Sequence, residues 1–188
     1  MRPMIEHPPA SLWTIGHSTL AIEAFIAHLQ RHEIATLADV RRYPGSRRYP
    51  HFNPDALAEA LRASAIEYVS MSELGGRRKA RADSPNVNWR NEAFRGYADY
   101  MQTAEFARAL QRLAAMARAG RTAIMCAEAL WWRCHRSLIA DAFKAAGTRV
   151  WNIESDGRAT EHPYTSAAQI VKGELTYGSA QDLFGASG

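Results

Sequence analysis

The alternation of short apolar runs with helix-like segments constrains this chain more than any other feature of its sequence. Five apolar runs of strand length are found at 12–16, 36–40, 68–71, 122–126 and 149–153. Amphipathic or capped helical segments are predicted between them, at about 20–31, from Asn53–Pro54 onward, from Thr103 to Gly120, and around 138–143 up to Gly147. Neighbouring parallel strands need crossover connections, which are usually helices. The sequence therefore predicts a single α/β domain, with a mainly parallel five-stranded sheet and helices on both faces.

Two stretches lack this periodicity. The segment from Met71 to about Glu92 is polar, contains Gly75 and Gly76, and is typical of a lid or a binding loop. Beyond Glu154 the pattern weakens to a short helix predicted at 166–171 and a loose tail. We therefore expect one domain over 1–188, with its core at about 12–154 and a C-terminal extension at 155–188.

Composition excludes several classes of protein. With 188 residues, 47% of them hydrophobic, the chain can bury one core without disulfides or a structural metal. No apolar run approaches the roughly 20 residues of a membrane span, and the N-terminus lacks an apolar signal core. Two cysteines do not make a secreted disulfide framework. We expect a cytoplasmic protein with reduced thiols and no membrane partner.

The positive charge is concentrated in one segment. Residues 41–95 hold 11 of the 23 Lys and Arg but only 6 of the 19 Asp and Glu, interleaved with aromatic residues. This mixture is typical of surfaces that bind anionic, base-bearing ligands, and it also occurs on basic faces that only aid solubility. The partners predicted are an anionic small molecule or a nucleic acid, and the oligomeric state is left open.

The chemically reactive residues follow the predicted strands. In open parallel sheets the ligand crevice lies beyond the carboxyl ends of the strands. The residues that stand there are Gly16-His17-Ser18-Thr19, Asp39-Val40-Arg41, Glu73 to Arg77, Cys126-Ala127-Glu128 with Arg133 to Arg136, and Asn152-Ile153-Glu154. If the sheet forms, these five loops meet at one edge.

The first two of these loops each allow two interpretations. The Ser18 hydroxyl either binds an anion at a helix N-terminus or caps the helix, while His17 stands where a crevice would open. Asp39 and Arg41 either form a local ion pair or hold a catalytic group in orientation.

The segment MCAEALWWRCHRSLIAD has the highest density of reactive groups. Cys134 and His135 stand at the start of a predicted helix, where the dipole and nearby cations lower a thiol pKa. One interpretation of this segment is a cysteine nucleophile beside cationic side chains that bind an anion. The other is that both cysteines are small, buried, apolar residues of the core. Six residues separate Cys126 from Arg133, so the five-residue loop of cysteine phosphatases is not met. Cys126, Glu128, Cys134 and His135 also resemble metal ligands, but their spacing matches no paired-cysteine zinc pattern. No residue is therefore assigned to a metal, whether one binds near these residues is left open, and no cofactor is identified.

Several motifs together resemble one known family. They are TIGHS, DVRRYPGSRRYPHFN, EYVSMSELGGRR, FRGYADYM, MCAEALWWRCHR and VWNI, spread in order over about residues 12–154. The set resembles the family catalogued as domain of unknown function 488. The resemblance implies a compact bacterial or archaeal cytoplasmic α/β domain with an active-site-like set of polar positions, but no established reaction. The positions implied are His17, Ser18, Asp39, Arg41, Ser46, Gly75, Gly76, Cys126, Glu128, Cys134, His135 and Arg136. One departure is Asn152, where relatives often have His.

Two functions compete. The first is an enzyme, with hydrolysis favoured, that acts on a phosphate-bearing or nucleic-acid-derived substrate at the sheet edge. Its predicted catalytic residues are His17, Asp39, Cys126, Glu128 and His135. Its predicted substrate-binding residues are Ser18, Arg41, Ser46, Gly75, Gly76, Arg133 and Arg136. The second is a non-catalytic nucleic-acid-binding module that uses the basic segment 41–95.

Overall fold

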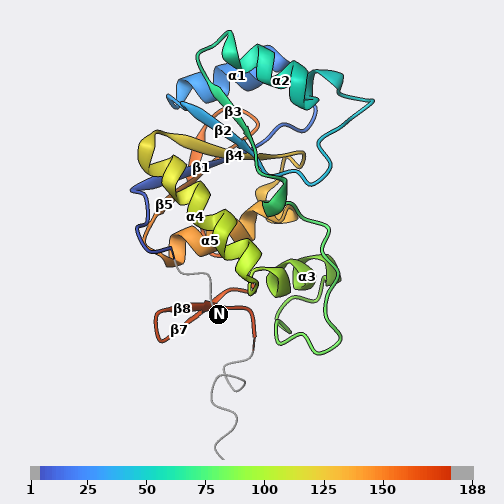
Figure 1. Cartoon of the computed structure of the whole chain (residues 1–188), viewed down its shortest axis with the longest axis vertical. Helices are drawn as coiled ribbons and strands as arrows, with labels where there is room; N and C mark the ends of the chain where they lie inside the picture. Colours follow the sequence, from blue (N-terminus) through green and yellow to red (C-terminus); the bar gives the residue numbers. More distant parts are fainter. Residues whose placement is uncertain (1–4, 179–188) are drawn as a thin grey trace, which may run out of the picture.

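A six-stranded sheet forms the centre of the molecule, as seen in a computed structural model that describes residues 5–178 (Figure 1). Its strands are β1 (Ser11–Gly16), β2 (Thr36–Asp39), β3 (Glu67–Ser70), β4 (Thr122–Cys126), β5 (Arg149–Ile153) and β6 (Ala159–Glu161). They are arranged in the order β3-β2-β4-β1-β5-β6. The first five are parallel, and β6 pairs with β5 in the antiparallel direction. The predicted α/β class is confirmed, and so are the five predicted strands.

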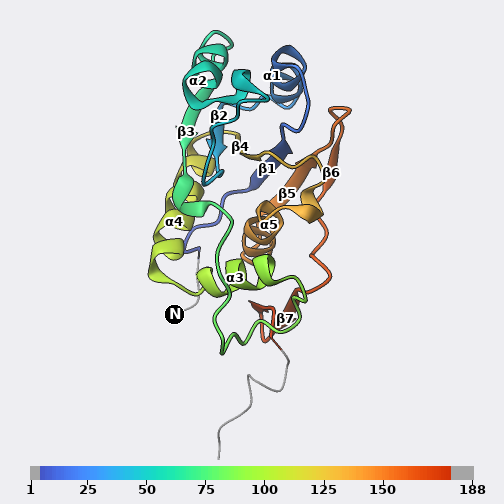
Figure 2. The same ribbon diagram turned by 90° about the vertical axis from the view of Figure 1, so that its right-hand side faces the viewer.

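Helices cover both faces of the sheet (Figures 1 and 2). They are α1 (Ile22–Arg31), α2 (Pro54–Arg62), α3 (Glu92–Tyr100), α4 (Ala104–Ala119) and α5 (Arg136–Ala145). Phe25 of α1 and Leu57 of α2 pack in one apolar cluster with alternate strand residues such as Ile15. Helices α3, α4 and α5 pack in a second cluster against the opposite side chains, such as Ile124 of β4. Two cores therefore hold the strand ends in place from either side.

Local signals explain where the helices begin and end. The Thr103 hydroxyl accepts a hydrogen bond from the Phe106 N–H at the start of α4, which ends before Gly120. Pro54 occupies the first position of α2, where its missing N–H is not needed. Helix α3 lies outside the predicted elements, and its signal is Asn91, whose side chain accepts from the amides of Ala93 and Phe94.

The C-terminal part of the chain differs from the prediction. The helix predicted at 166–171 is wrong, because these residues lead into a hairpin of β7 (Gln169–Val171) and β8 (Glu174–Thr176). Lys172 and Gly173, both with positive φ, form the two-residue turn. This pair matches the geometry of a type I′ turn, whose twist fits a hairpin. The tail predicted to be loose instead adds β6 to the sheet as a sixth strand and packs beside α5, while residues 179–188 lie outside the described part.

Among residues 5–178, no helix has both the length and the apolar character needed to cross a membrane.

Candidate active site at the carboxyl edge of the sheet

The ends of three neighbouring strands place the reactive residues close together. β4 lies between β2 and β1, with Cys126 paired to Gly16 and Met125 paired to Asp39. The Val40 amide continues this pairing by donating to the Met125 carbonyl. Residues that follow β1, β2 and β4 in sequence are therefore neighbours at one edge.

A cavity of about 320 Å³ opens at this edge. Its walls come from the loops after β2, β3 and β4 and from the start of α3. The lining residues are Arg41, Arg42, Tyr43, Gly76, Arg77, Asn91, Ala93, Phe94, Cys126, Ala127, Glu128, Arg133, Cys134 and His135. The loops after β1 and β5 contribute no residue to this lining, so three of the five predicted loops meet around it.

The two cysteines form a pair in this cavity. The Cys134 and Cys126 sulfur atoms lie 2.7 Å apart, and both residues are buried as free thiols. The Glu128 amide donates to the Cys126 sulfur at 3.3 Å. Two sulfurs this close share one hydrogen bond, so they titrate as a unit.

Arg136 supplies the positive charge beside this pair. Its Nη1 donates to the Cys126 sulfur at 2.6 Å and to the Glu128 carbonyl at 2.5 Å, and its Nη2 donates to the Ala129 carbonyl. The side chain is 1% exposed, and its hydrogen bonds go to a sulfur and two carbonyls rather than to a carboxylate. A buried cation is stabilised by nearby negative charge, so Arg136 favours the thiolate form of the pair.

The protonation of the pair follows from these contacts. Burial opposes ionisation of Cys134, but the hydrogen bond from Cys126 and the charge of Arg136 outweigh it and lower the pKa of Cys134. Burial raises the pKa of Cys126, and its hydrogen bond to Cys134 adds to this. The pair therefore loses its first proton readily and keeps its second.

His135 is oriented toward the pair. Its Nε2 donates to the Val40 carbonyl at 3.0 Å, which leaves Nδ1 as the acceptor 3.4 Å from the Cys134 sulfur. Burial lowers the pKa of His135, so the imidazole is neutral and available as a base. A Cβ at Gly76 would lie 2.8 Å from Nδ1, so the ring seats against a position that only glycine fills without a shift.

His17 and Asp39 act on the cavity through Arg41 and do not line it. Asp39 accepts from Arg41 Nε at 2.9 Å and Nη2 at 2.6 Å, and from the Tyr68 hydroxyl at 2.8 Å. His17 Nε2 accepts from Arg41 Nη1 at 3.3 Å, and its ring stacks on Phe52. Burial and then the charge of Arg41 lower the pKa of His17 to about 4. The predicted proton-transfer role of His17 has no geometric support here, because both of its ring nitrogens are used inside the protein.

The predicted residues Ser18, Ser46 and Gly75 also lie outside the cavity lining. The amides of His17 and Ser18 donate to the Cys126 and Ala127 carbonyls, so neither is free to bind an anion. Helix α1 has Ala21 at its N-cap, so the interpretation of Ser18 as the helix cap is wrong. The Ser46 hydroxyl accepts from the Tyr49 amide and stabilises its own loop.

The sequence did not single out several cavity residues. Tyr43 is 65% exposed, and the guanidinium groups of Arg42 and Arg77 lie 5.7 and 5.8 Å from its ring centre. The basic clusters of segment 41–95 contained this signal. Asn91 is the N-cap of α3, and Phe94 is one of the aromatic residues of this segment, but nothing in the sequence places α3 beside the sheet.

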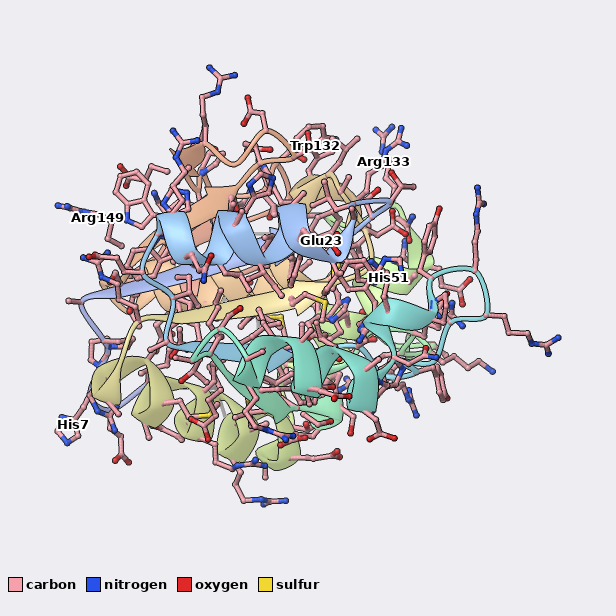
Figure 3. The ribbon with its side chains drawn as sticks, turned by 90° about the horizontal axis from the view of Figure 1, so that it is seen from above. His7, Glu23, His51, Trp132, Arg133 and Arg149 are labelled. Carbon is pink, nitrogen blue, oxygen red and sulfur yellow. The ribbon has the colours of Figure 1, made fainter. Side chains whose placement is uncertain are left out.

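Positive charge predominates in the cavity lining. Four arginines line it, namely Arg41, Arg42, Arg77 and Arg133, against one carboxylate, Glu128. Arg133 and Trp132 extend outward from the loop between β4 and α5 (Figure 3). Within residues 5–178, no group of three or more His, Cys, Asp or Glu side chains is arranged to hold a metal ion. The cavity therefore brings four guanidinium groups, which are suited to bind anions, beside a thiol pair and a neutral imidazole.

Neither a comparison with curated proteins nor one with solved structures gave a match. A family model described as "Domain of unknown function DUF488" matches residues 21–143. This range includes the Asp39–Arg41 pair, both cysteines and His135, and it covers more than half of the chain. The chain belongs to the DUF488 family.

Proposed function

We propose that this protein is a cysteine-dependent hydrolase of a small, phosphate-bearing substrate. The observation that carries the proposal is the thiol pair with a neutral imidazole, Cys134 beside Cys126 and His135, in a cavity lined by four arginines. Arginine forks suit phosphate oxygens, and a thiolate with an adjacent base is an activated nucleophile.

Cys134 is the better candidate nucleophile of the two cysteines. Its sulfur is the one that contacts His135, whereas the Cys126 sulfur is held by Arg136 and the Glu128 amide. In the proposed reaction His135 Nδ1 takes the proton of Cys134, and the Cys134 thiolate attacks phosphorus. A sulfur–phosphorus bond forms, the bond from phosphorus to the leaving oxygen breaks, and the alcohol takes this proton from His135. Water then attacks phosphorus and gives a proton to His135, the sulfur–phosphorus bond breaks, and phosphate leaves as the proton returns to Cys134.

Glu128 and the arginines have separate proposed roles. Glu128 is the carboxylate in the lining, so it is the group available to orient the attacking water. Arg41 is held by Asp39, the Phe52 carbonyl and His17, and it also lines the cavity, so one N–H donor is left for a substrate. Arg42, Arg77 and Arg133 supply further positive charge around the opening. The volume of about 320 Å³ suits a mononucleotide or a sugar phosphate rather than a polymer.

A panel of phosphomonoesters and nucleotides, assayed for phosphate release, tests this proposal. Cys134→Ser should lower turnover at least about a thousandfold, because it removes the nucleophile. Arg77→Gln should raise KM about tenfold, because it removes one cation from the substrate side. Arg108→Gln is the matched control, since Arg108 is exposed on α4 and lies outside the cavity lining, and it should leave both constants unchanged. Full turnover in Cys134→Ser, or no phosphate release from any substrate, would overturn the proposal.

A further inference from the structure

Cys126 and Cys134 are the only two cysteines in the whole chain, and the fold brings them together. They come from different elements: Cys126 is the last residue of β4, and Cys134 immediately precedes His135 at the N-cap of α5. The loop 127–133 between them forms part of the cavity wall. A catalytic thiol alone does not require a second thiol at 2.7 Å, so the pairing calls for its own explanation.

The surroundings of the pair favour attack by one sulfur on an oxidant. Arg136 Nη1 stabilises negative charge on the sulfurs, and His135 Nδ1 lies 3.4 Å from Cys134 to accept its proton. Both cysteines line the cavity although they are only 2% and 5% exposed, so a small oxidant can reach them while a large one cannot. A sulfur–sulfur bond is about 2.05 Å long, so a further approach of roughly 0.7 Å would close it.

We infer that Cys126 and Cys134 form a site of reversible oxidation, in which a hydroperoxide converts the two thiols to an intramolecular disulfide and a dithiol reductant restores them. The Cys134 thiolate attacks one peroxide oxygen, the oxygen–oxygen bond breaks, and the departing oxygen takes up a proton to leave as water or an alcohol. Cys134 is then a sulfenic acid. The Cys126 sulfur attacks the Cys134 sulfur, the sulfur–oxygen bond breaks, and water leaves with the Cys126 proton. The two thiols lose two electrons and two protons, and the peroxide gains them.

This inference rests on the proposed function for its consequence but not for its chemistry. The disulfide removes the thiolate that serves as nucleophile, so the oxidised enzyme is inactive. The second thiol also protects the first, because rapid closure of the disulfide prevents oxidation to sulfinic acid, which most enzymes cannot reverse.

Counting free thiols tests this inference directly, because the chain has no cysteine besides Cys126 and Cys134. The reduced full-length protein is treated with one equivalent of hydrogen peroxide, and its free thiols are counted after unfolding. We expect two thiols before treatment, none after it, and two again after dithiothreitol. Trypsin cleaves after Arg121, Arg133 and Arg136, so mass spectrometry without reductant should find peptide 122–133 linked to peptide 134–136.

Single variants provide the controls. Cys126→Ser should leave a sulfenic acid at Cys134 that a dimedone-type reagent traps, and Cys134→Ser should leave Cys126 largely unreacted. Two thiols remaining after peroxide, sulfinic acid in place of the linked peptides, or a disulfide between two chains would each overturn the inference.

Phosphate release from the same samples separates this inference from the proposed function. Turnover should fall as the linked peptides accumulate and return on reduction. Linked peptides with undiminished turnover would overturn Cys134 as nucleophile and leave the disulfide standing. Turnover that needs Cys134, without linked peptides, would overturn the disulfide alone.

Discussion

Arg41 shows how a single side chain connects buried and exposed parts of the site. A guanidinium has five N–H donors. Two N–H groups of Arg41 donate hydrogen bonds to Asp39, one donates to the Phe52 carbonyl and one to His17. The same side chain also lines the cavity. Such a fully supported guanidinium loses little freedom when a ligand binds. Asp39 and His17 therefore hold the Arg41 guanidinium in place.

At Gly76, one added methyl group would test the thiol–imidazole geometry. The new Cβ of Gly76→Ala would lie 2.8 Å from His135 Nδ1, so the ring must shift relative to the Cys134 sulfur. We expect alkylation of the reduced protein by iodoacetamide at neutral pH to slow about tenfold, because Cys134 loses its base. Circular dichroism should show an unchanged fold.

Gly45→Ala is the matched control for this substitution. Nothing lies within 4 Å of a Cβ built at Gly45, and Gly45 itself is exposed. Its alkylation rate should equal that of the wild type. Equal rates in both variants would show that His135 does not assist Cys134.

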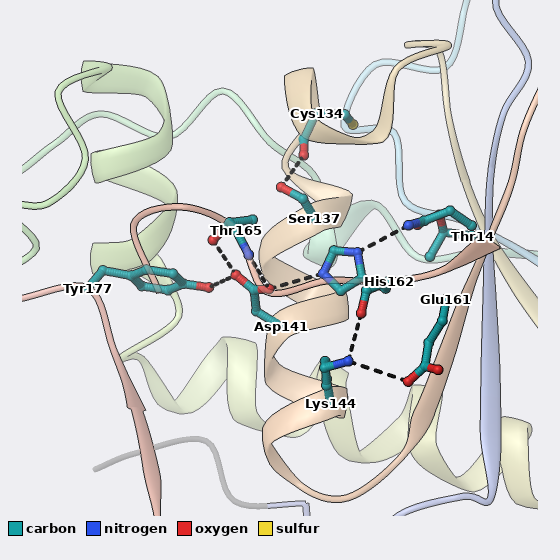
Figure 4. Close-up of polar contacts among 10 residues, drawn as sticks. Thr14, Cys134, Ser137, Asp141, Lys144, Glu161, His162, Thr165 and Tyr177 are labelled. Carbon is teal, nitrogen blue, oxygen red and sulfur yellow. Dashed lines mark hydrogen bonds and ion pairs between the residues drawn. The ribbon is translucent and has the colours of Figure 1, made fainter. Parts of the chain in front are cut away.

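At the scale of elements, one buried hydrogen-bond network holds the C-terminal segment against α5 (Figure 4). Asp141 of α5 accepts from His162 Nε2, from the Thr165 amide and hydroxyl, and from the Tyr177 hydroxyl. His162 is linked in turn through Asn152 to Thr14 of β1. The network anchors the segment after β5 to the helix whose N-terminus holds His135.

Removing the charge of Asp141 should weaken this anchoring. Asp141→Asn replaces an oxygen that accepts hydrogen bonds by an amide nitrogen, inside a completely buried site. We expect a loss of about 1–3 kcal/mol in the free energy of unfolding, measured by urea denaturation. Hydrogen exchange should accelerate most over residues 162–177.

Thr160→Val provides the comparison on the same segment. The Thr160 hydroxyl donates to Glu154 in an exposed position, so its loss should change the free energy of unfolding by less than about 0.5 kcal/mol. An equal loss of unfolding free energy in both variants would mean that burial of the Asp141 network adds nothing to stability.

At the scale of the whole molecule, part of the basic segment 41–95 packs into the fold, while arginines such as Arg47, Arg48 and Arg90 are exposed. Phe52 is fully buried, and Trp89 and Phe94 stack on each other. The Arg78 guanidinium lies 3.6 Å from the centre of the Tyr100 ring and donates to two carbonyls. Tyr43, with Arg42 and Arg77, remains at the surface and is the observation that favours the alternative of a nucleic-acid-binding module.

Oligonucleotides of increasing length distinguish the two functions. A cavity for one small anion predicts similar dissociation constants for a mononucleotide and for a long single strand. A nucleic-acid-binding surface predicts affinity that grows with length, with a log–log salt slope of about −0.7 per phosphate contact. Fluorescence anisotropy at several salt concentrations measures both, and a slope of several units would favour the binding module over the hydrolase.

Within residues 5–178, the sequence by itself determined five of the eight strands, four of the five α-helices and the edge of the sheet where the reactive residues gather. These follow from hydrophobic periodicity, from glycine or proline at helix ends, and from the rule that parallel strands need crossovers, all of which act locally along the chain. Short polar strands such as β6 carry no such pattern, and the turn at Lys172–Gly173 redirected residues that looked helical.

Only the tertiary structure decided which residues face the cavity. Cys126 and Cys134 are eight positions apart in sequence, and their sulfur contact depends on where α5 packs against β4. His17 and Asp39 stand at strand ends as predicted, yet the Arg41 guanidinium lies against both, because a buried ion pair needs all its hydrogen bonds satisfied. Sequence spacing fixes the neighbours of a residue along the chain, whereas the direction of its side chain depends on packing between elements that are distant in sequence.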